Sequence, residues 1–149
     1  MIFLDYNSAE NKIKEIVYRS SQILEDVVDF LYKNIDHYSW IGIYLVDGND
    51  LILGPWMGKQ ATQHTRIPIG KGICGSAAAS GKTEIIPDVN TDDRYLACFI
   101  STKSEIVVPI KKDGKILGEI DIDSDIKDAF KIADKEFLER IADMLSEHI

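Results

Sequence analysis

The chain has 149 residues, of which 45% are hydrophobic and 28% are charged, and its formal net charge is -8. This length and balance are typical of one globular domain with its own core, and no repeat or linker divides residues 1–149. The negative charge argues against nucleic acid or an anionic membrane as the main partner, because both are negatively charged themselves. No segment approaches the roughly 18 consecutive apolar residues of a membrane span.

The chain contains two cysteines, Cys74 and Cys98. Its first six residues lack the basic flank and the apolar stretch of a secretion signal, so we expect a cytoplasmic protein. In that compartment a disulfide is transient or catalytic rather than structural.

Apolar residues recur at helical spacing near both ends of the chain. Ser8 is a predicted N-cap of a first helix, and the apolar positions that follow it are Ile13, Ile16, Val17, Leu24, Val27, Val28 and Leu31. The last helix is predicted to begin near Asp134, as its N-cap, and to bury Phe137, Ile141 and Leu145. Two long helices therefore enclose the central part of the sequence.

Between these helices the apolar period falls to two, which indicates strands. Residues 40–46 and 51–56 are predicted to pair through a turn at 47–50, the second strand ending near Pro55. Residues 105–110 and 116–123 are predicted to pair through a turn at Asp113-Gly114. Three of these strands have one purely aliphatic face, which we expect to meet the helices. Their opposite faces carry Trp40, Tyr44, Glu105, Asp121 and Asp123.

This pattern predicts an α+β fold with an antiparallel sheet. The two long helices would cover one face, and the segments between the strand pairs would cover the other face as a lidded pocket.

Both cysteines lie outside the aliphatic runs. Cys74 follows the turn Gly70-Lys71-Gly72, and residues 75–80 are predicted to form a short helix closed by Gly81. The positive end of that helix dipole would favour the thiolate. Cys98 lies in a loop from about 88 to 104, a length typical of lids and binding loops. The two thiols suggest a reactive pair, although spacing alone leaves open two unrelated buried cysteines.

The acidic face predicts proton chemistry. Asp121 and Asp123 project to the same side of one strand, and Glu105 joins them if its strand is a neighbour. Crowded carboxylates cannot all stay ionised, so one would have a raised pKa and donate a proton while another binds an ammonium group. Trp40 and Tyr44 would form a wall for a small apolar or sulfur-bearing group. The alternatives are a solvated acidic face and plain aromatic packing.

These residues together favour a thiol reaction on a small zwitterion. The two cysteines and His64 have irregular spacing and do not match a metal-binding motif, so we predict no metal. Gly70-x-Gly72 lacks the rest of a phosphate-loop fingerprint.

Several motifs in this order resemble those of a known family. They are WIGIY at 40–44, LGP at 53–55, RIPIGKGICG at 66–75, PDV at 87–89, LAC at 96–98, SEIVVP at 104–109 and DIDS at 121–124. With this order of helices and strands, the chain resembles a single GAF domain over residues 1–149. Within that superfamily it resembles the free methionine-(R)-sulfoxide reductases.

The resemblance implies a substrate, free methionine-(R)-sulfoxide, and a reductant, thioredoxin, with no metal or organic cofactor. The position of the attacking cysteine falls on Cys98 and that of the resolving cysteine on Cys74. The substrate carboxylates and pocket aromatics fall on Glu105, Asp121, Asp123, Trp40 and Tyr44. Glu105, with Asp121 and Asp123 as alternatives, would donate the proton to the departing oxygen.

The chain departs from the family pattern at two places. Many members have a third cysteine just before the segment that matches Arg66, whereas residues 61–65 here read ATQHT. This leaves Cys74 as the only partner for Cys98. Tyr95 stands where a histidine is often found, so no role of that histidine carries over.

A non-catalytic GAF sensor of a small ligand is the alternative from another functional class. Such a sensor would signal through an output segment, and none extends beyond Ile149 in this sequence. We therefore expect the enzyme. A homodimer formed through the terminal helices is left open.

Overall fold

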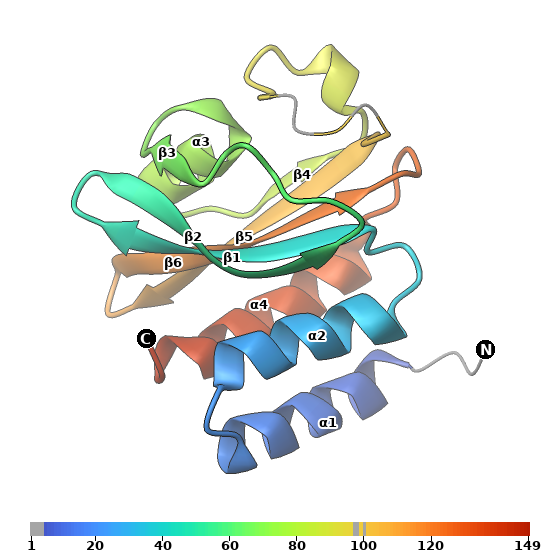
Figure 1. Ribbon diagram of the computed structural model, residues 1–149, viewed down its shortest axis with the longest axis vertical. Coiled ribbons are helices and arrows are strands. Elements are labelled where there is room, and N and C mark those ends of the chain that lie inside the picture. The colour runs from blue at the N-terminus through green and yellow to red at the C-terminus, as the bar shows by residue number, and fades with distance from the viewer. Residues whose placement is uncertain (1–4, 97–98, 100) are drawn as a thin grey trace.

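The computed structural model describes residues 5–96, 99 and 101–149. A six-stranded antiparallel sheet with the order β3-β2-β1-β6-β5-β4 forms the centre (Figure 1). The strands are β1 (Trp40–Asp47), β2 (Asp50–Gly58), β3 (Arg66–Pro68), β4 (Glu84–Ile86), β5 (Ser104–Lys112) and β6 (Lys115–Ser124). The helices are α1 (Tyr6–Arg19), α2 (Ile23–Asn34), α3 (Gly72–Ser80) and α4 (Ile132–Ser146), with a 3-10 turn, η1 (Val89–Thr91).

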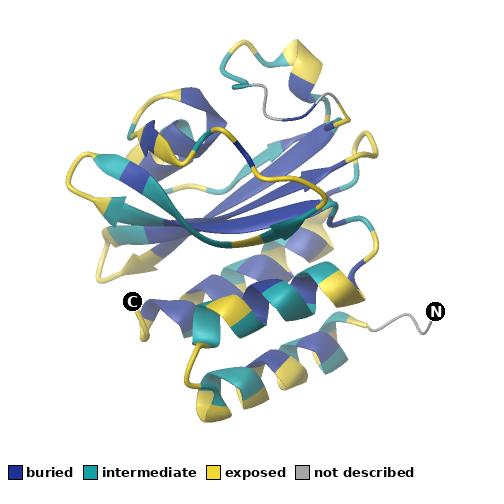
Figure 2. Ribbon diagram, in the orientation of Figure 1, coloured by how far each residue is buried: buried dark blue, intermediate teal, exposed yellow. Residues whose placement is uncertain are grey.

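The elements form layers around this sheet. α2 and α4 cover one face, with α1 packed outside them, while α3 and the η1 loop lie over the other face (Figure 1). This arrangement confirms the predicted α+β fold. Figure 2 shows that the central strands are buried, whereas the exposed residues lie on turns and on the outer sides of the helices. Among the described residues, no helix has the length and apolar content to cross a membrane.

The first predicted helix is two helices. The cap of α1 is Asp5, whose Oδ1 accepts a hydrogen bond from the Ser8 N–H at 2.8 Å, so Ser8 is not the N-cap. The chain then breaks at residues 20–22. Ser20 Oγ accepts from the Gln22 N–H at 2.9 Å and donates to Asp26 at 2.6 Å. Such local hydrogen bonds compete with helix continuation, and α2 returns beside α1.

The last helix also begins earlier than predicted. Its N-cap is Lys131, and Asp134 occupies the third helical position, where its Oδ2 accepts from the Lys131 N–H at 2.9 Å. The predicted buried positions Phe137, Ile141 and Leu145 are all fully buried.

The aliphatic face of the sheet is confirmed. Its side chains pack with α1, α2 and α4 in one core, and they are Ile41, Ile43, Ile106, Val108, Ile110, Ile120 and Ile122. The turn between β5 and β6 has positive φ at both Asp113 (53°) and Gly114 (77°). Only a few residue types accept such dihedrals, which a two-residue hairpin turn of this kind requires.

β2 does not end at Pro55 but continues to Gly58. The register between β1 and β2 shifts between Gly42 and Tyr44, so β2 accommodates Gly54 and Pro55 in a bulge. β3 pairs with β2 only from Asp50 to Ile52, so Pro55 removes no hydrogen bond on that side. The strands β3 and β4 were not predicted, because three residues are too few to show a period of two.

Candidate active site

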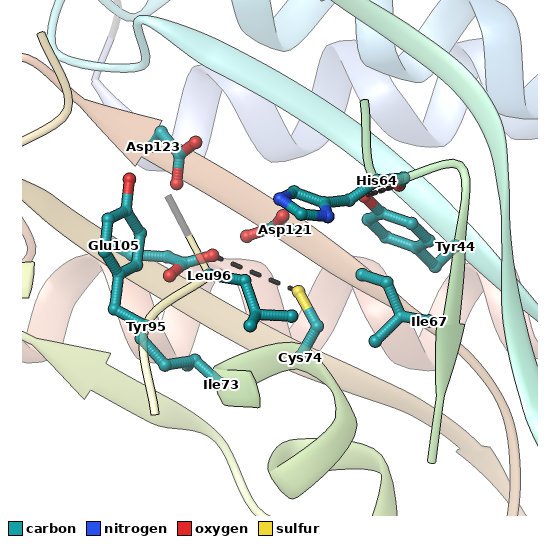
Figure 3. A pocket seen from close by; sticks show the side chains of 10 residues that line it. All are labelled: Tyr44, His64, Ile67, Ile73, Cys74, Tyr95, Leu96, Glu105, Asp121 and Asp123. Atoms are coloured by element: carbon teal, nitrogen blue, oxygen red, sulfur yellow. Dashed lines mark hydrogen bonds between the residues drawn. The ribbon is translucent and has the colours of Figure 1, made fainter. Parts of the chain in front are cut away.

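The second face of the sheet encloses a small cavity. Its floor carries Tyr44 from β1, Glu105 from β5, and Asp121 and Asp123 from β6 (Figure 3). Cys74 enters from α3, and its sulfur points toward the carboxylates. The enclosed volume is about 20 Å³, which is room for one water molecule.

Strand register brings the predicted carboxylates together. Glu105 on β5 pairs with Asp123 on β6, and Asp121 lies two residues earlier on the same side. On the other flank of β6, Gly42 of β1 pairs with Asp121. The predicted juxtaposition of these three acids is therefore confirmed by the sheet topology.

The acidic face is buried rather than solvated. Glu105, Asp121 and Asp123 have exposed fractions of 5%, 6% and 4%. Burial raises the pKa of Asp121, and interactions with Glu105 and Cys74 offset only part of this increase. Burial, together with the charge of Asp121, raises the pKa of Asp123 well above its ordinary value. Oδ1 of each aspartate has no hydrogen-bond partner within the described part of the chain. These groups can both hold protons and accept new hydrogen bonds.

A fourth acid lies on the same face and was assigned no role from the sequence. Glu119 precedes Asp121 by two residues on β6 and is fully buried. Neither of its carboxylate oxygens has a hydrogen-bond partner among the described residues. Burial and the charge of Asp121 raise its pKa well above the ordinary value. The alternation along β6 is the signal that identifies it.

Cys74 has a different protonation preference from the one predicted. Its Sγ lies 4.0 Å from Glu105 Oε2 near the start of α3. Burial, followed by the charges of Asp121, Glu119 and Glu105, raises the pKa of the thiol well above its usual range. The helix dipole was expected to favour the thiolate, but burial and the nearby carboxylates outweigh it. In this arrangement Cys74 is a thiol.

The two predicted aromatic residues occupy different places. Tyr44 lines the cavity, and its hydroxyl donates to the His64 carbonyl at 2.7 Å. Trp40 instead lines an adjacent hollow that shares Asp123 with the cavity. Its ring stacks on Trp56 with centroids 6.2 Å apart and contacts Phe99 at 6.0 Å. The structure therefore brings Tyr44, but not Trp40, to the sulfur.

The loop that follows η1 covers the cavity. Tyr95 and Leu96 form part of its wall (Figure 3). Arg94 anchors this segment to β4 through Glu84, with N···O distances of 2.9 and 3.1 Å. Leu96 packs so closely on Gly72, at the start of α3, that a Cβ there would lie 2.8 Å from Leu96 Cδ1. The described part of the loop thus lies where the lid was predicted.

Three comparisons with known proteins agree with this geometry. The GAF domain family matches residues 20–149. The free methionine-R-sulfoxide reductase of Saccharomyces cerevisiae is 49% identical over 112 residues, which span 72% of this chain and 61% of the yeast protein. The free methionine-R-sulfoxide reductase of Neisseria meningitidis, solved in complex with its substrate, has a TM-score of 0.89 at 33% identity, over 95% of this chain and 86% of that one. The reduced fRMsr of Staphylococcus aureus has a TM-score of 0.88 at 39% identity, over 96% and 94% of the two chains.

The chain belongs to the free methionine-R-sulfoxide reductases, within the GAF family. These enzymes are oxidoreductases, so the membership favours catalysis over the sensor alternative. The chain spans less than two thirds of the yeast reductase.

For a reductase of this family, the sequence assigns the attacking thiol to Cys98. That residue lies outside the described residues, so its placement relative to Cys74 stays a prediction. The roles of Cys74, Glu105, Asp121 and Asp123 also stay predictions, although their proximity is now established.

Cys74, Glu105 and Asp121 are the described residues that come closest to a metal-binding group. Their donor atoms lie within 4.8 Å of one another. Zinc sites draw mainly on Cys and His, whereas two of these three donors are carboxylates. We assign the group to thiol and proton chemistry, and the predicted absence of a metal stays a prediction.

Proposed function

We propose that the protein reduces free methionine-(R)-sulfoxide to methionine through its cysteine thiols. The observation that carries the proposal is the buried group of carboxylates beside the Cys74 sulfur. Membership of the reductase family supports the same substrate, because the relatives from Saccharomyces cerevisiae and Neisseria meningitidis are free methionine-R-sulfoxide reductases.

The carboxylates explain why a free amino acid would be selected. Its ammonium group supplies three hydrogen-bond donors and a positive charge. Oδ1 of Asp121 and Oδ1 of Asp123 have no hydrogen-bond partner in the described part of the chain and could accept from these donors. A methionine sulfoxide within a peptide has no ammonium group. The cavity of about 20 Å³ is smaller than any amino acid, so it must enlarge to admit the substrate, and we expect Tyr95 and Leu96 of the covering loop to move outward.

In the first step, the Cys98 thiolate attacks the sulfoxide sulfur. A carboxylic acid, Glu105 or one of Asp121 and Asp123, gives a proton to the departing oxygen. Burial raises the pKa of Asp121 and of Asp123 above the ordinary value, which favours the protonated acid that such a step needs. The protonated oxygen passes from the substrate sulfur to the Cys98 sulfur, so the substrate S–O bond breaks, methionine leaves and Cys98 becomes a sulfenic acid.

In the second step, Cys74 loses its proton and attacks the Cys98 sulfur. The S–S bond forms, the S–O bond breaks, and the oxygen leaves as water. Thioredoxin then reduces the disulfide by thiol–disulfide exchange. The cytoplasmic location that suits this reductant stays a prediction, as does pairing through the terminal helices.

A thiol count combined with a thioredoxin-coupled assay tests the proposal. Reduced protein mixed with free methionine-(R)-sulfoxide should lose both of its thiols per chain, and the coupled assay should turn over. The S form and a peptide-bound form should react far more slowly. A sensor would bind the ligand and keep both thiols, whereas a disulfide-regulated scaffold would oxidise equally with peroxide.

Cysteine variants separate the two steps. Cys98→Ser should abolish even a single turnover, whereas Cys74→Ser should complete one turnover and then stall unless a small thiol rescues it. Multiple turnovers by Cys98→Ser with thioredoxin would show that the attacking residue is assigned wrongly.

A further inference from the structure

The surroundings of Cys74 contain negative groups in excess. Glu105 lies 4.0 Å from the sulfur, and Asp121 completes a group of donor atoms within 4.8 Å. Glu119, also on β6, acts on the thiol as well. No lysine or arginine is found among the described residues that line the cavity. His64 is the one basic side chain among these described lining residues, against four buried carboxylates, so further positive charge would come from outside the described wall.

We propose that the ammonium group of the bound amino acid activates Cys74 by neutralising the carboxylates around its sulfur. This inference rests on the proposed function, and it adds that substrate binding switches on the resolving thiol. The empty site keeps Cys74 as an unreactive thiol. The occupied site releases the thiol proton to solvent and leaves the thiolate ready to attack.

The physical basis is the direction of the charge effects on the sulfur. Burial and three carboxylates hold the pKa of Cys74 well above its usual range. An opposite charge within about 4–6 Å shifts a pKa by roughly 1–3 units. An ammonium group that binds between Asp121 and Glu105 would come within this range of the sulfur, because the donor atoms of Cys74, Glu105 and Asp121 lie within 4.8 Å of one another. It would therefore oppose the largest charge effect on the thiol.

Other groups around the sulfur do not replace this ammonium. His64 lines the cavity and favours the ionised form of Asp121. The Tyr44 hydroxyl donates to the His64 carbonyl, and Tyr95 contributes to the cover. Asp123 adds a further negative charge to the same wall. The net field at Cys74 from these described groups therefore disfavours the thiolate until a cation enters.

Such coupling has a chemical advantage. Thiolates react with oxidants and with other disulfides, whereas thiols do so slowly. A resolving cysteine that ionises only beside a bound amino acid would avoid oxidation while the enzyme waits for substrate. Substrate and product both carry the ammonium group, so Cys74 would stay activated while Cys98 is oxidised.

The test is a titration of Cys74 in the Cys98→Ser protein, in which it is the sole cysteine. Thiolate absorbance is followed against pH, with the protein lacking both cysteines subtracted to remove the tyrosine signal. Saturating L-methionine should lower the titration midpoint by about one pH unit or more. The analogue that lacks the amino group, 3-(methylthio)propionate, should leave the midpoint unchanged.

Variants provide a second measurement. Asp121→Asn in the same Cys98→Ser protein should lower the titration midpoint of Cys74 without ligand. L-methionine should then lower this midpoint by less than it does in the Cys98→Ser parent. Asp113→Asn, in the exposed turn between β5 and β6, is the matched control and should change neither value.

Calorimetric binding of L-methionine to the Cys98→Ser protein decides between the possible failures. Binding without a shift of the midpoint would overturn the activation of Cys74 and leave the proposed function intact. An equal shift with the analogue would also overturn it, because the ammonium group would not be the cause. Absence of saturable binding would overturn both proposals.

Discussion

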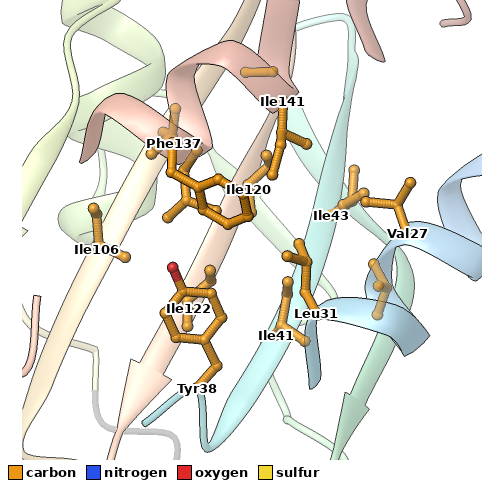
Figure 4. Close-up of a cluster of buried hydrophobic side chains, with 14 of the residues drawn as sticks. Val27, Leu31, Tyr38, Ile41, Ile43, Ile106, Ile120, Ile122, Phe137 and Ile141 are labelled. Atoms are coloured by element: carbon orange, nitrogen blue, oxygen red, sulfur yellow. The ribbon is translucent and has the colours of Figure 1, made fainter. Parts of the chain in front are cut away.

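Asp134 and Asp121 are both buried aspartates, one on each side of the same sheet, and their surroundings differ. Tyr38 and Phe137 belong to the aliphatic core that Figure 4 shows, and Asp134 contacts this core through the Tyr38 hydroxyl. Its Oδ1 accepts from Tyr6 and from Tyr38 at 3.0 Å and lies 2.8 Å from His37 Nε2. Asp121 borders the cavity, and its Oδ1 has no partner among the described residues.

The partners reverse the effect of burial. Burial alone would raise the pKa of Asp134, but hydrogen bonds from His37, the Lys131 N–H and Tyr6 lower it below its ordinary value. Burial raises the pKa of Asp121, and its neighbours Glu105 and Cys74 lower it only in part. Burial therefore does not decide what an acid does in this fold. Asp134 is stabilised as an anion, whereas Asp121 is left able to take a proton or a ligand.

Removing the charge of Asp134 should have the largest effect on stability. In Asp134→Asn the donors of Tyr6, Tyr38 and His37 lose a charged acceptor, so the free energy of unfolding should fall by about 3 kcal/mol. Urea denaturation measures this loss, and the kinetic constants of the folded variant should stay within about twofold of the parent. Asp128→Asn, which alters an exposed ion pair with Lys131, is the control. A loss as small as that of the control would refute the stabilising role of Asp134.

The corresponding change on the cavity side should impair catalysis and leave stability intact. Asp121→Asn removes a proton carrier and an acceptor for the ammonium group, so kcat/KM should fall about 100-fold in the thioredoxin-coupled assay. Its free energy of unfolding should stay the same or rise, because a buried carboxylate without a full set of partners is removed. Substantial loss of stability together with intact kinetics would show that Asp121 has a structural role like that of Asp134.

The two sides should also respond oppositely to pH. The folded pKa of Glu119 is raised above 4.5, so between pH 4.5 and that folded value the unfolded chain has released a proton that the folded chain keeps. Stability should therefore fall as the pH rises through this window, by at most about 1.4 kcal/mol per pH unit for each such group. The lowered pKa of Asp134 acts in the other direction, since its contribution is present above pH 3.8 and is lost as the pH falls.

The Glu119→Gln variant isolates the contribution of one carboxyl group to this pH dependence of stability. Urea denaturation at a series of pH values should show a smaller decline in the variant than in the parent above pH 4.5. Glu15→Gln on the exposed surface of α1 makes the same chemical change and should leave the slope unaltered. An unchanged slope in Glu119→Gln would mean that Glu119 titrates alike in the folded and unfolded chains.

Local regularities allowed much of this contrast to be predicted. Alternation along a strand is fixed by backbone geometry, so the sequence correctly separated the aliphatic face from the face with Glu105, Asp121 and Asp123. The turn at Asp113-Gly114 and the closure of α3 by Gly81, which has φ of 70°, were likewise predictable from residues that accept left-handed backbone.

Interactions between distant segments could not be predicted in this way. Asp134 was interpreted only as an N-cap. Its hydrogen bonds with Tyr6 and Tyr38 could not be predicted, because these residues lie more than 90 positions away in the sequence. The helix dipole at Cys74 is a local effect, whereas it is outweighed by burial and by carboxylates that come from β5 and β6. The break after α1 was missed because apolar residues keep their helical spacing across Ser20 and Gln22, and only hydrogen bonds reveal the end.

The smallest predicted effect concerns the cover over the acids. Gly72 and Gly81 both have φ of 70°, so an alanine at either position should cost about 1 kcal/mol in strained backbone. At Gly81 the nearest heavy atom to an added Cβ would lie at 3.5 Å, whereas at Gly72 it would be Leu96 Cδ1 at 2.8 Å. Gly72→Ala must therefore displace Leu96, but Gly81→Ala displaces nothing.

The two alanine variants should thus lose similar free energies of unfolding but differ at the cavity. Alkylation of Cys74 in the Cys98→Ser protein should be faster in Gly72→Ala, because Leu96 no longer seals the cavity wall, and unchanged in Gly81→Ala. Equal alkylation rates would mean that Leu96 does not limit access to the sulfur. The protection of the acidic face would then depend on Tyr95 or on other parts of the loop. The opposite face of the sheet differs, because continuous helices cover it.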